Sequence, residues 1–268
     1  MKRAIALGTF DGVHIGHRAI INAAIDKAAE LDMEPMIYTF TAHPMALFGK
    51  QPPLLMTQSE RIAALGGMGC TLSADEFSAE YAATEPEQFI KMLIERFDMG
   101  CAVAGFNYTF GRRGEGSVEL IKKLGEKYGF AVEIVPPVMY KGEAVSSTRI
   151  RACLEAGRVK DAGEMLGAPY SITGPVIRNR GIGRTLDYPT ANIAGWEDRA
   201  VPMAVCVESP ARTLRAGISR MPPTPTVPMS PPTRTATSNN RRNIACSTVV
   251  MPWNSNPHAM LICYVNML

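Results

Sequence analysis

GTFDGVHIGH, from Gly8 to His17, is the most informative stretch of this sequence. It follows a short apolar run, Ala4–Leu7, and opens a helical pattern, His17–Leu31. Its glycines permit a tight turn and let the backbone approach a ligand closely. A helix N-terminus offers free N–H groups and a positive partial charge, which suit a phosphate. The stretch therefore predicts a strand, a glycine-rich turn and a helix that together bind a phosphate.

Two histidines in this stretch, His14 and His17, are three residues apart and share one face of a helical first turn. Two imidazoles aimed at one point can donate hydrogen bonds to a phosphate under attack, where charge builds in the transition state. No protein nucleophile is needed if the acceptor's own phosphate attacks. Two histidines placed by chance are the alternative. The chain holds only four histidines, and two lie here, which favours the catalytic interpretation.

Apolar runs alternate with helical patterns from residue 4 to residue 135. This rhythm predicts an α/β domain with a parallel sheet covered on both faces, whose ligands bind at the carboxyl ends of the strands. The expected strands are Ala4–Leu7, Met36–Phe40, Ala102–Ala104 and Val132–Val135, and the expected helices are His17–Leu31, Gln58–Leu65, Pro86–Phe97 and Ser117–Tyr128.

Two further helices, Ser147–Ala156 and Val159–Leu166, are expected before the pattern changes. Tyr170–Ile177 then alternates polar and apolar residues, as an antiparallel strand does. We therefore expect a domain boundary near Gly167–Pro169 and a first domain that spans residues 1–168.

Composition excludes several classes of protein. The chain has 268 residues, 46% of them apolar, and a net charge of +3, which is too small to indicate a nucleic-acid partner. None of its six cysteines forms a CxxC pair, so neither a zinc ribbon nor a dithiol redox site is indicated. The apolar part of Met1–Gly8 is too short for a signal-peptide core, and no apolar run is long enough to span a membrane. We expect a cytoplasmic protein without a membrane partner; the oligomeric state stays open.

Five segments, in order, resemble the bifunctional bacterial riboflavin kinase/FAD synthetase family, whose first domain is a Rossmann-like HxGH nucleotidyltransferase. Two positions depart from the family pattern: Ala42 stands where proline is usual, and Asn107 stands in an acidic position. The resemblance extends from residue 1 to about residue 193. Its segments are Gly8–His17, Phe40–Pro44, Gly105–Gly114, Val145–Arg151 and Leu166–Gly174.

The resemblance implies an enzyme that transfers AMP from ATP to FMN, with Mg²⁺, and releases FAD and diphosphate. It assigns the catalytic role to His14 and His17. The ATP-binding residues that it implies are Gly8, Phe10, Asp11, Gly16, Ser147, Thr148 and Arg149, and the flavin-binding residues are His43, Asn107, Tyr108 and Phe110.

Alternatives remain for these residues and for the function. The hydroxyls of Ser147 and Thr148 suit either a triphosphate or a helix N-cap. The aromatic residues around Asn107 could stack on a flavin or anchor a loop, and His43 could be structural. Another HxGH transferase, with glycerol phosphate or phosphopantetheine as acceptor, is the second hypothesis for the function. A non-catalytic flavin-binding protein is the third.

The segment after the boundary resembles the start of a riboflavin kinase domain, a six-stranded antiparallel barrel in that family. Gly181–Asn192 matches its glycine-rich segment, with Asp187 in place of a glycine. The resemblance implies that Thr190 and Asn192 hold Mg²⁺ and ATP phosphates, and that riboflavin is a second substrate. We expect an incomplete barrel over residues 169–198.

From residue 199 the resemblance ends and the composition changes. Ten of the 20 prolines lie in residues 199–268, and no Asp or Glu follows Glu208. The kinase family's catalytic glutamate has no counterpart here. We expect residues 199–268 to be an aberrant, disordered tail that lacks kinase activity. A frameshifted reading of a kinase domain is our hypothesis for this tail, and a true but degenerate tail is the alternative.

Overall fold

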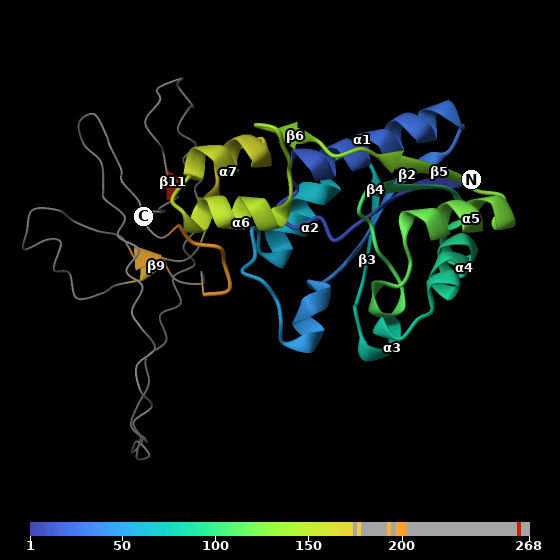
Figure 1. The fold of residues 1–268 in the computed structure, drawn as a ribbon, viewed down its shortest axis with the longest axis horizontal. Coiled ribbons are helices and arrows are strands. Elements are labelled where there is room, and N and C mark those ends of the chain that lie inside the picture. The colour runs from blue at the N-terminus through green and yellow to red at the C-terminus, as the bar shows by residue number, and fades with distance from the viewer. Residues whose placement is uncertain (174–175, 178–191, 194–196, 203–261, 264–268) are drawn as a thin grey trace, which may run out of the picture. The chain divides into compact units, whose positions relative to one another are not determined.

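The computed structural model describes residues 1–173, 176–177, 192–193, 197–202 and 262–263 (Figure 1). Contacts divide the chain into two compact units, and the first contains Met1–Pro169 together with residues 198–202. The described elements of the first unit are β1 (Arg3–Leu7), α1 (Ile15–Glu30), β2 (Glu34–Phe40), η1 (Pro44–Phe48), α2 (Gln58–Gly66), β3 (Thr71–Asp75), α3 (Ala79–Ala82), α4 (Pro86–Phe97), β4 (Met99–Gly105), η2 (Arg112–Gly114), α5 (Val118–Tyr128), β5 (Ala131–Val135), β6 (Met139–Tyr140), β7 (Glu143–Ala144), α6 (Ser147–Glu155) and α7 (Val159–Leu166).

A five-stranded parallel sheet forms the centre of the first unit, in the order β3-β2-β1-β4-β5. Ile5 of β1 lies opposite Met36 of β2 on one side and Ala102 of β4 on the other. The chain moves outward from β1 to β3 and then crosses to β4 and β5, so the strand order reverses between β1 and β4. Sheets of this kind bind ligands at such a switch point, outside the carboxyl ends of the strands. The predicted parallel α/β fold is confirmed.

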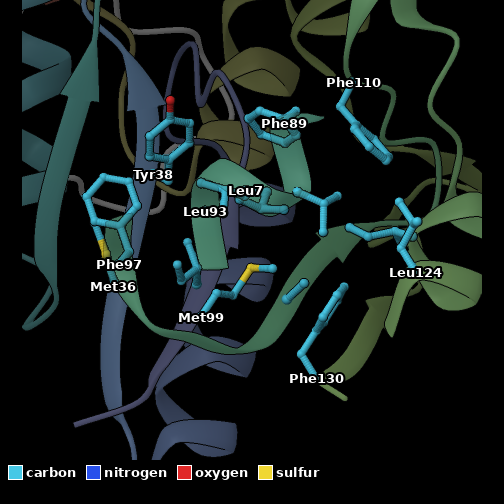
Figure 2. Packing of buried hydrophobic residues seen from close by; sticks show 14 residues of the cluster. Leu7, Met36, Tyr38, Phe89, Leu93, Phe97, Met99, Phe110, Leu124 and Phe130 are labelled. Atoms are coloured by element: carbon cyan, nitrogen blue, oxygen red, sulfur yellow. The ribbon is translucent and has the colours of Figure 1, made fainter. Parts of the chain in front are cut away.

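Side chains of β1 show how the two faces of the sheet are covered. Ala4 and Ala6 belong to the cluster on the α1 face, where their small size lets the helix approach closely. Ile5 and Leu7 belong to the opposite cluster, which α4 and α5 supply with large apolar side chains. Figure 2 shows Leu7 close to Phe89 and Leu93 in that cluster. A parallel sheet that is buried on both faces needs apolar residues at every position, which explains the continuous apolar runs.

The predicted helices are confirmed, with ends that differ by at most two residues. Pro86 begins α4 after the N-cap Glu85, and Ser117 caps α5. α2 begins with a capping box in which Thr57 and Glu60 satisfy each other's backbone N–H groups. Among the described residues, no helix is long and apolar enough to cross a membrane.

The short elements η1, α3, η2, β6 and β7 were not predicted, and two further differences concern strands. β3 (Thr71–Asp75) was not expected, because it is an edge strand without a single buried residue and carries no apolar run. The single strand expected over Tyr170–Ile177 is wrong. It divides into β8 (Ser171–Ile172), which pairs in parallel with β11 (Ile262–Cys263), and β9 (Val176–Ile177), which pairs antiparallel with β10 (Asn192–Ile193). Pro175 has no N–H to donate to a continuous ladder.

The second unit is described only at residues 170–173, 176–177, 192–193, 197 and 262–263, so most of the expected barrel lies outside the described residues, as does the proline-rich part of the tail. The first residues of the expected tail do not behave as a tail. The N–H of Leu54 donates to the Asp198 carbonyl at 2.7 Å, and the N–H of Ala200 donates to the Leu54 carbonyl at 2.9 Å. Arg199, Ala200 and Val201 are buried in the first unit.

Candidate active site

A cavity of about 350 Å³ opens at the switch point of the sheet. Its wall contains the carboxyl ends of β1, β4 and β5, the first turn of α1 and the first turn of α6. Several predicted site residues, far apart in the sequence, line this one cavity. They are Gly8, Phe10, His14, Gly16, His17, Asn107, Tyr108, Ser147 and Thr148.

The turn between β1 and α1 has an unusual backbone. Phe10 and Val13 have positive φ values of 53° and 39°, and Gly12 has a φ of 82°. A positive φ is a genuine outlier for a β-branched residue such as valine. Arg18 donates from Nε to the Val13 carbonyl at 3.1 Å and helps to hold this conformation. Strained backbone of this kind clusters at functional sites, where the surrounding structure maintains it.

His14 and His17 are placed together by the start of α1. His14 is the N-cap, and its Nδ1 accepts a hydrogen bond from the His17 backbone N–H at 3.2 Å. The two imidazole rings stack with centroids 3.5 Å apart. A Cβ on Gly16 would lie 3.2 Å from the His14 ring, so a side chain at that position would push the ring. Glycine between the histidines thus keeps the stacked geometry.

Burial keeps both histidines neutral at pH 7. It lowers the pKa of His14 from 6.5 to about 4; the hydrogen bond with its backbone opposes this shift, and the positive charge of Arg151 adds to it. Burial also lowers the pKa of His17 well below 6.5, with further contributions from His14 and Arg61. Because Nδ1 of His14 accepts a hydrogen bond, the proton of the neutral ring resides on Nε2. His14 therefore keeps one N–H for a ligand.

The start of α6 forms the opposite wall of the cavity. Its N-cap is Ser146, whose Oγ accepts from the Arg149 N–H at 3.2 Å, so neither Ser147 nor Thr148 is the N-cap. Ser147 donates from Oγ to the Asp11 carbonyl at 2.9 Å, while Thr148 is exposed beside the cavity. Two helices, α1 and α6, thus present their N-termini to one space, and both favour an anion there.

Arg149 turns away from this cavity. Its Nη1 donates to the Glu143 carbonyl at 2.8 Å, and its Nε pairs with the Glu143 carboxylate at 3.1 Å. It is not among the residues that line the cavity. The structure therefore ties this predicted ATP-binding arginine to the neighbouring strand β7.

Asn107 and Tyr108 follow the carboxyl end of β4 and line the cavity beside the exposed ring of Phe106. Phe110 does not line it, because its side chain is buried in the cluster that contains Phe89. The Tyr108 ring stacks on the Phe110 ring, with centroids 5.8 Å apart. Phe110 thus supports the aromatic wall from behind, and the rim is formed by the other three residues.

Asp11 and His43 lie apart from the other predicted residues and line a second, smaller cavity of about 80 Å³. The buried Asp11 carboxylate accepts from the Leu55 N–H at 3.2 Å and forms an ion pair with Arg151. His43 is the N-cap of η1, and its Nδ1 accepts from the Met45 N–H at 3.2 Å. Burial lowers the pKa of His43; the charge of Asp11 opposes the shift, and Arg151 and Arg61 add to it.

Arg61 also lines the smaller cavity, and sequence reasoning did not single it out. Its guanidinium is buried and donates four hydrogen bonds near the ends of β1 and β2. The acceptors are the Thr9 carbonyl at 2.9 Å, Thr39 Oγ1 at 3.0 Å, the Phe40 carbonyl at 2.6 Å and the Thr41 carbonyl at 3.2 Å. One signal was present in the sequence: Arg61 lies four residues before Leu65, on the face of α2 that an apolar residue would occupy.

Thr190 and Asn192, the predicted ligands of a kinase metal site, cannot be placed. Thr190 lies outside the described residues, and only the backbone of Asn192 is described, at the start of β10. Within the described part of the chain, no group of three or more His, Cys, Asp or Glu side chains could hold a metal ion.

Two family models match the chain. The model described as FAD synthetase matches residues 1–149, and the model described as riboflavin kinase matches residues 166–219. The first covers the sheet, the large cavity and the start of α6. The second begins at the last residue of α7.

Curated relatives carry the name bifunctional riboflavin kinase/FMN adenylyltransferase. The protein of Bacillus subtilis is 36% identical over 206 residues, which are 75% of this chain and 65% of that protein. The protein of Listeria monocytogenes is 31% identical over 206 residues, which are again 75% of this chain and 65% of that protein. The protein of Escherichia coli K12 is 30% identical over 70% of this chain and 62% of its own length. The chain thus spans somewhat less than two thirds of the length of these relatives.

A solved structure is also similar to this chain. Its title describes a macrolide-efflux protein from Streptococcus pneumoniae, and it is 32% identical, with a TM-score of 0.66. The similarity covers 75% of this chain and 66% of that chain.

Proposed function

The chain belongs to the FAD synthetase family, and from this premise we propose that it transfers the AMP part of ATP to FMN, giving FAD and diphosphate. The names of the curated relatives support the choice of acceptor. The observation that carries the proposal is the stacked pair His14 and His17, which lines a cavity between two helix N-termini.

The reaction needs no nucleophile from the protein. A phosphate oxygen of FMN attacks the α-phosphorus of ATP and forms a new P–O bond. The bond from this phosphorus to the oxygen that bridges to the β-phosphate breaks, and diphosphate leaves with the electron pair. Such transfers depend on positioning and on stabilising the charge of the transferred group.

We assign this stabilisation to the two histidines. His14 is neutral and carries its proton on Nε2, so it donates one hydrogen bond to a phosphate oxygen without a proton transfer. The Nδ1 atom of His17 is buried and has no hydrogen-bond partner in the described part of the chain. A hydrogen bond to substrate at this atom would remove the cost of leaving it unpaired. Both rings are fixed in place before the reaction, which is the arrangement that lowers a barrier most.

The nucleotide is proposed to lie between the starts of α1 and α6. Gly8 leaves room beside the Phe10 ring, since a Cβ there would lie 2.9 Å from it, and Gly16 leaves room beside His14. The hydroxyls of Ser147 and Thr148 face the triphosphate in this arrangement. Asp11 acts by holding the turn, since its carboxylate is engaged with Leu55 and Arg151. Arg149 would have to leave Glu143 to reach a phosphate.

The flavin is proposed to lie against the residues that follow β4. Tyr108 and the exposed Phe106 offer aromatic surfaces for the isoalloxazine ring, and Asn107 offers an amide to orient it. Phe110 supports Tyr108 through the stacked contact. His43 remains a proposed flavin contact from the smaller cavity.

Mg²⁺ enters the proposal as the ion that accompanies ATP. No carboxylate is among the residues that line the large cavity, which offers hydroxyl and amide oxygens such as those of Thr9 and Asn107. Mg²⁺ is usually held by one or two carboxylates together with substrate phosphates. The cavity therefore suits the ion only as a partner of the nucleotide phosphates, and we route no step through it.

Riboflavin phosphorylation is proposed to be impaired. The riboflavin kinase model matches only residues 166–219, and the sequence beyond has no counterpart of the family's catalytic glutamate. ATP-dependent formation of FMN from riboflavin by the purified chain would refute this proposal. A cytoplasmic location is also proposed, and it is consistent with the free thiols of Cys70, Cys101 and Cys153.

One assay tests the function and its alternatives. The purified chain is incubated with ATP, Mg²⁺ and FMN, and FAD and diphosphate are measured together. Equal amounts of both products support the proposal. Diphosphate release only with glycerol phosphate or phosphopantetheine would identify another acceptor. Binding of FMN without either product would indicate a flavin-binding protein.

A further inference from the structure

We propose that Arg199 is a positioning residue of the adenylyl-transfer site, although it lies outside the sequence that the FAD synthetase model matches. The inference rests on the proposed function. Arg199 belongs instead to the sequence that the riboflavin kinase model matches, residues 166–219, while its contacts place it in the first unit. A short segment of the kinase-like sequence would thus serve the FAD synthetase fold.

Arg199 is buried against the loop before α2 and the first turn of that helix. Its side chain is only 3% exposed, and Nη1 pairs with Glu60 Oε2 at 2.8 Å. Nη2 donates to the Leu55 carbonyl at 3.1 Å. The backbone joins this contact, because Leu54 exchanges hydrogen bonds with Asp198 and Ala200 in a parallel bridge. The segment 198–202 therefore holds the loop through both its backbone and its guanidinium.

Leu55 connects this contact to the phosphate-binding turn. Its N–H donates to the Asp11 carboxylate at 3.2 Å, while its carbonyl accepts from Arg199. Its side chain packs over Gly12, where an added Cβ would lie 2.7 Å from Leu55 Cδ1. Arg151 binds the same loop, since its Nε donates to the Pro53 carbonyl at 2.6 Å and its guanidinium pairs with Asp11.

Asp11 connects the loop that Arg199 holds to the large cavity. Its carbonyl accepts from Ser147 Oγ at 2.9 Å, which links the turn to the start of α6. Asp11 stands between Phe10 and Gly12, both of which have positive φ. A non-glycine residue such as Phe10 keeps this conformation only where its surroundings hold it. Removing Arg199 would leave the Leu55 carbonyl without this donor and loosen the loop that holds Asp11.

The test uses the full chain with Arg199→Met and Arg199→Lys. The matched control is Arg158→Met, which removes an arginine that is 56% exposed and whose side-chain partners, Asp161 and Cys153, do not belong to the loop. Two properties are measured for each variant: kcat/KM for ATP in FAD synthesis, per folded molecule, and amide hydrogen exchange of residues 8–17. A double variant with Asp11→Asn tests whether Arg199 acts through Asp11.

For Arg199→Met we expect faster exchange of residues 8–17 and a fall of about tenfold in kcat/KM for ATP, because small displacements of positioned groups cost this much or more. Arg199→Lys keeps the pairing with Glu60 and should recover part of the loss. In the Asp11→Asn background, Arg199→Met should lower kcat/KM by less than about twofold, since residues in one network are not additive.

The proposal is overturned if Arg199→Met changes neither quantity relative to Arg158→Met, or if its effect adds in full to that of Asp11→Asn. Should Arg199→Met fail to fold, Arg199→Lys decides: wild-type exchange and kinetics in that variant refute a role for the guanidinium's hydrogen bond to Leu55. Failure of the proposed function looks different, because the unaltered chain then forms no FAD while the exchange measurement still reports on the turn.

Discussion

The imidazole rings of His14 and His17 stack with centroids 3.5 Å apart and planes inclined by 17°. The His17 N–H also donates to His14 Nδ1, so one helical turn fixes both rings. Burial lowers the pKa of both side chains, and His14 lowers that of His17 further. The pair is therefore neutral at physiological pH. Protonation of either ring costs more free energy in the folded chain than in the unfolded chain.

This penalty predicts a loss of stability in mild acid. The pKa of His14 is about 4 in the folded chain and 6.5 when exposed, so the unfolded chain binds more protons between these values. The contribution of His14 to the free energy of unfolding is fully present above pH 6.5 and is lost as the pH falls toward 4. From pH 7 to pH 5 it should remove about 2 kcal/mol of the free energy of unfolding. Urea titrations at the two pH values measure it.

His14→Asn is the matched variant, because asparagine retains an N-cap acceptor but does not titrate. Between pH 7 and pH 5, the free energy of unfolding of this variant should fall by about 2 kcal/mol less than that of the unaltered chain. An equal fall in both proteins would mean that His14 is not the titrating group.

Gly16→Ala should reduce activity without reducing stability. The new Cβ would lie 3.2 Å from the His14 ring and displace it, and we expect FAD synthesis to fall about tenfold. Gly66→Ala, at the end of α2, is the control, since nothing lies within 4 Å of its added Cβ. Steady-state rates and thermal unfolding are compared. Wild-type rates in Gly16→Ala would argue against a fixed His14 geometry.

Asn107→Ala should weaken FMN binding. Loss of one neutral hydrogen bond of about 1 kcal/mol corresponds to a roughly fivefold rise in KM for FMN. KM for ATP should stay within twofold, roughly, because the proposed nucleotide contacts lie on α1 and α6. Asn22→Ala, an exposed change on α1, is the control. If KM for ATP rises and KM for FMN does not, Asn107 contacts the nucleotide and not the flavin.

Arg61→Met should destabilise the first unit. The substitution leaves the part-buried carbonyls of Thr9, Phe40 and Thr41 without the donors they have now. We expect the free energy of unfolding to fall by about 3 kcal/mol. The exposed control Arg158→Met should change it by less than about 0.5 kcal/mol. Equal stabilities in urea would show that the strand ends do not depend on Arg61.

The sequence was sufficient for most of the fold because buried parallel strands are continuous apolar runs. β1, β2 and β4 carry such runs and were predicted, and β5 was predicted because four of its five residues are apolar, although it is an edge strand that contains Glu133. β3 carries none, since an edge strand buries little and its pairing with β2 depends on tertiary structure. Tyr170–Ile177 has the alternation of one strand, but the proline within it prevents a continuous ladder.

The site was predictable where its residues are local in sequence. His14, Gly16 and His17 fall in one turn, and the end of β4, which Asn107 follows, meets the start of α6, which carries Ser147, at the switch point. Charged residues that are buried by distant contacts were not predictable. Arg61 reaches Thr9 across 52 positions and Arg199 reaches Leu55 across 144, while charge alone suggests an exposed side chain. The contacts of Asp11 were not predictable for the same reason. Its carboxylate accepts from the Leu55 N–H and pairs with Arg151, and both residues are distant in sequence.

The most direct test is the rate of FAD formation in a single turnover, at saturating ATP and FMN, in the unaltered chain and in His17→Ala. Removing a donor that acts mainly in the transition state should slow this step by about 100-fold or more. ATP affinity, measured in the same preparation, should change by less than about threefold. An unaltered chain that forms no FAD, or a His17→Ala variant that loses binding and turnover equally, would contradict adenylyl transfer at the stacked histidines.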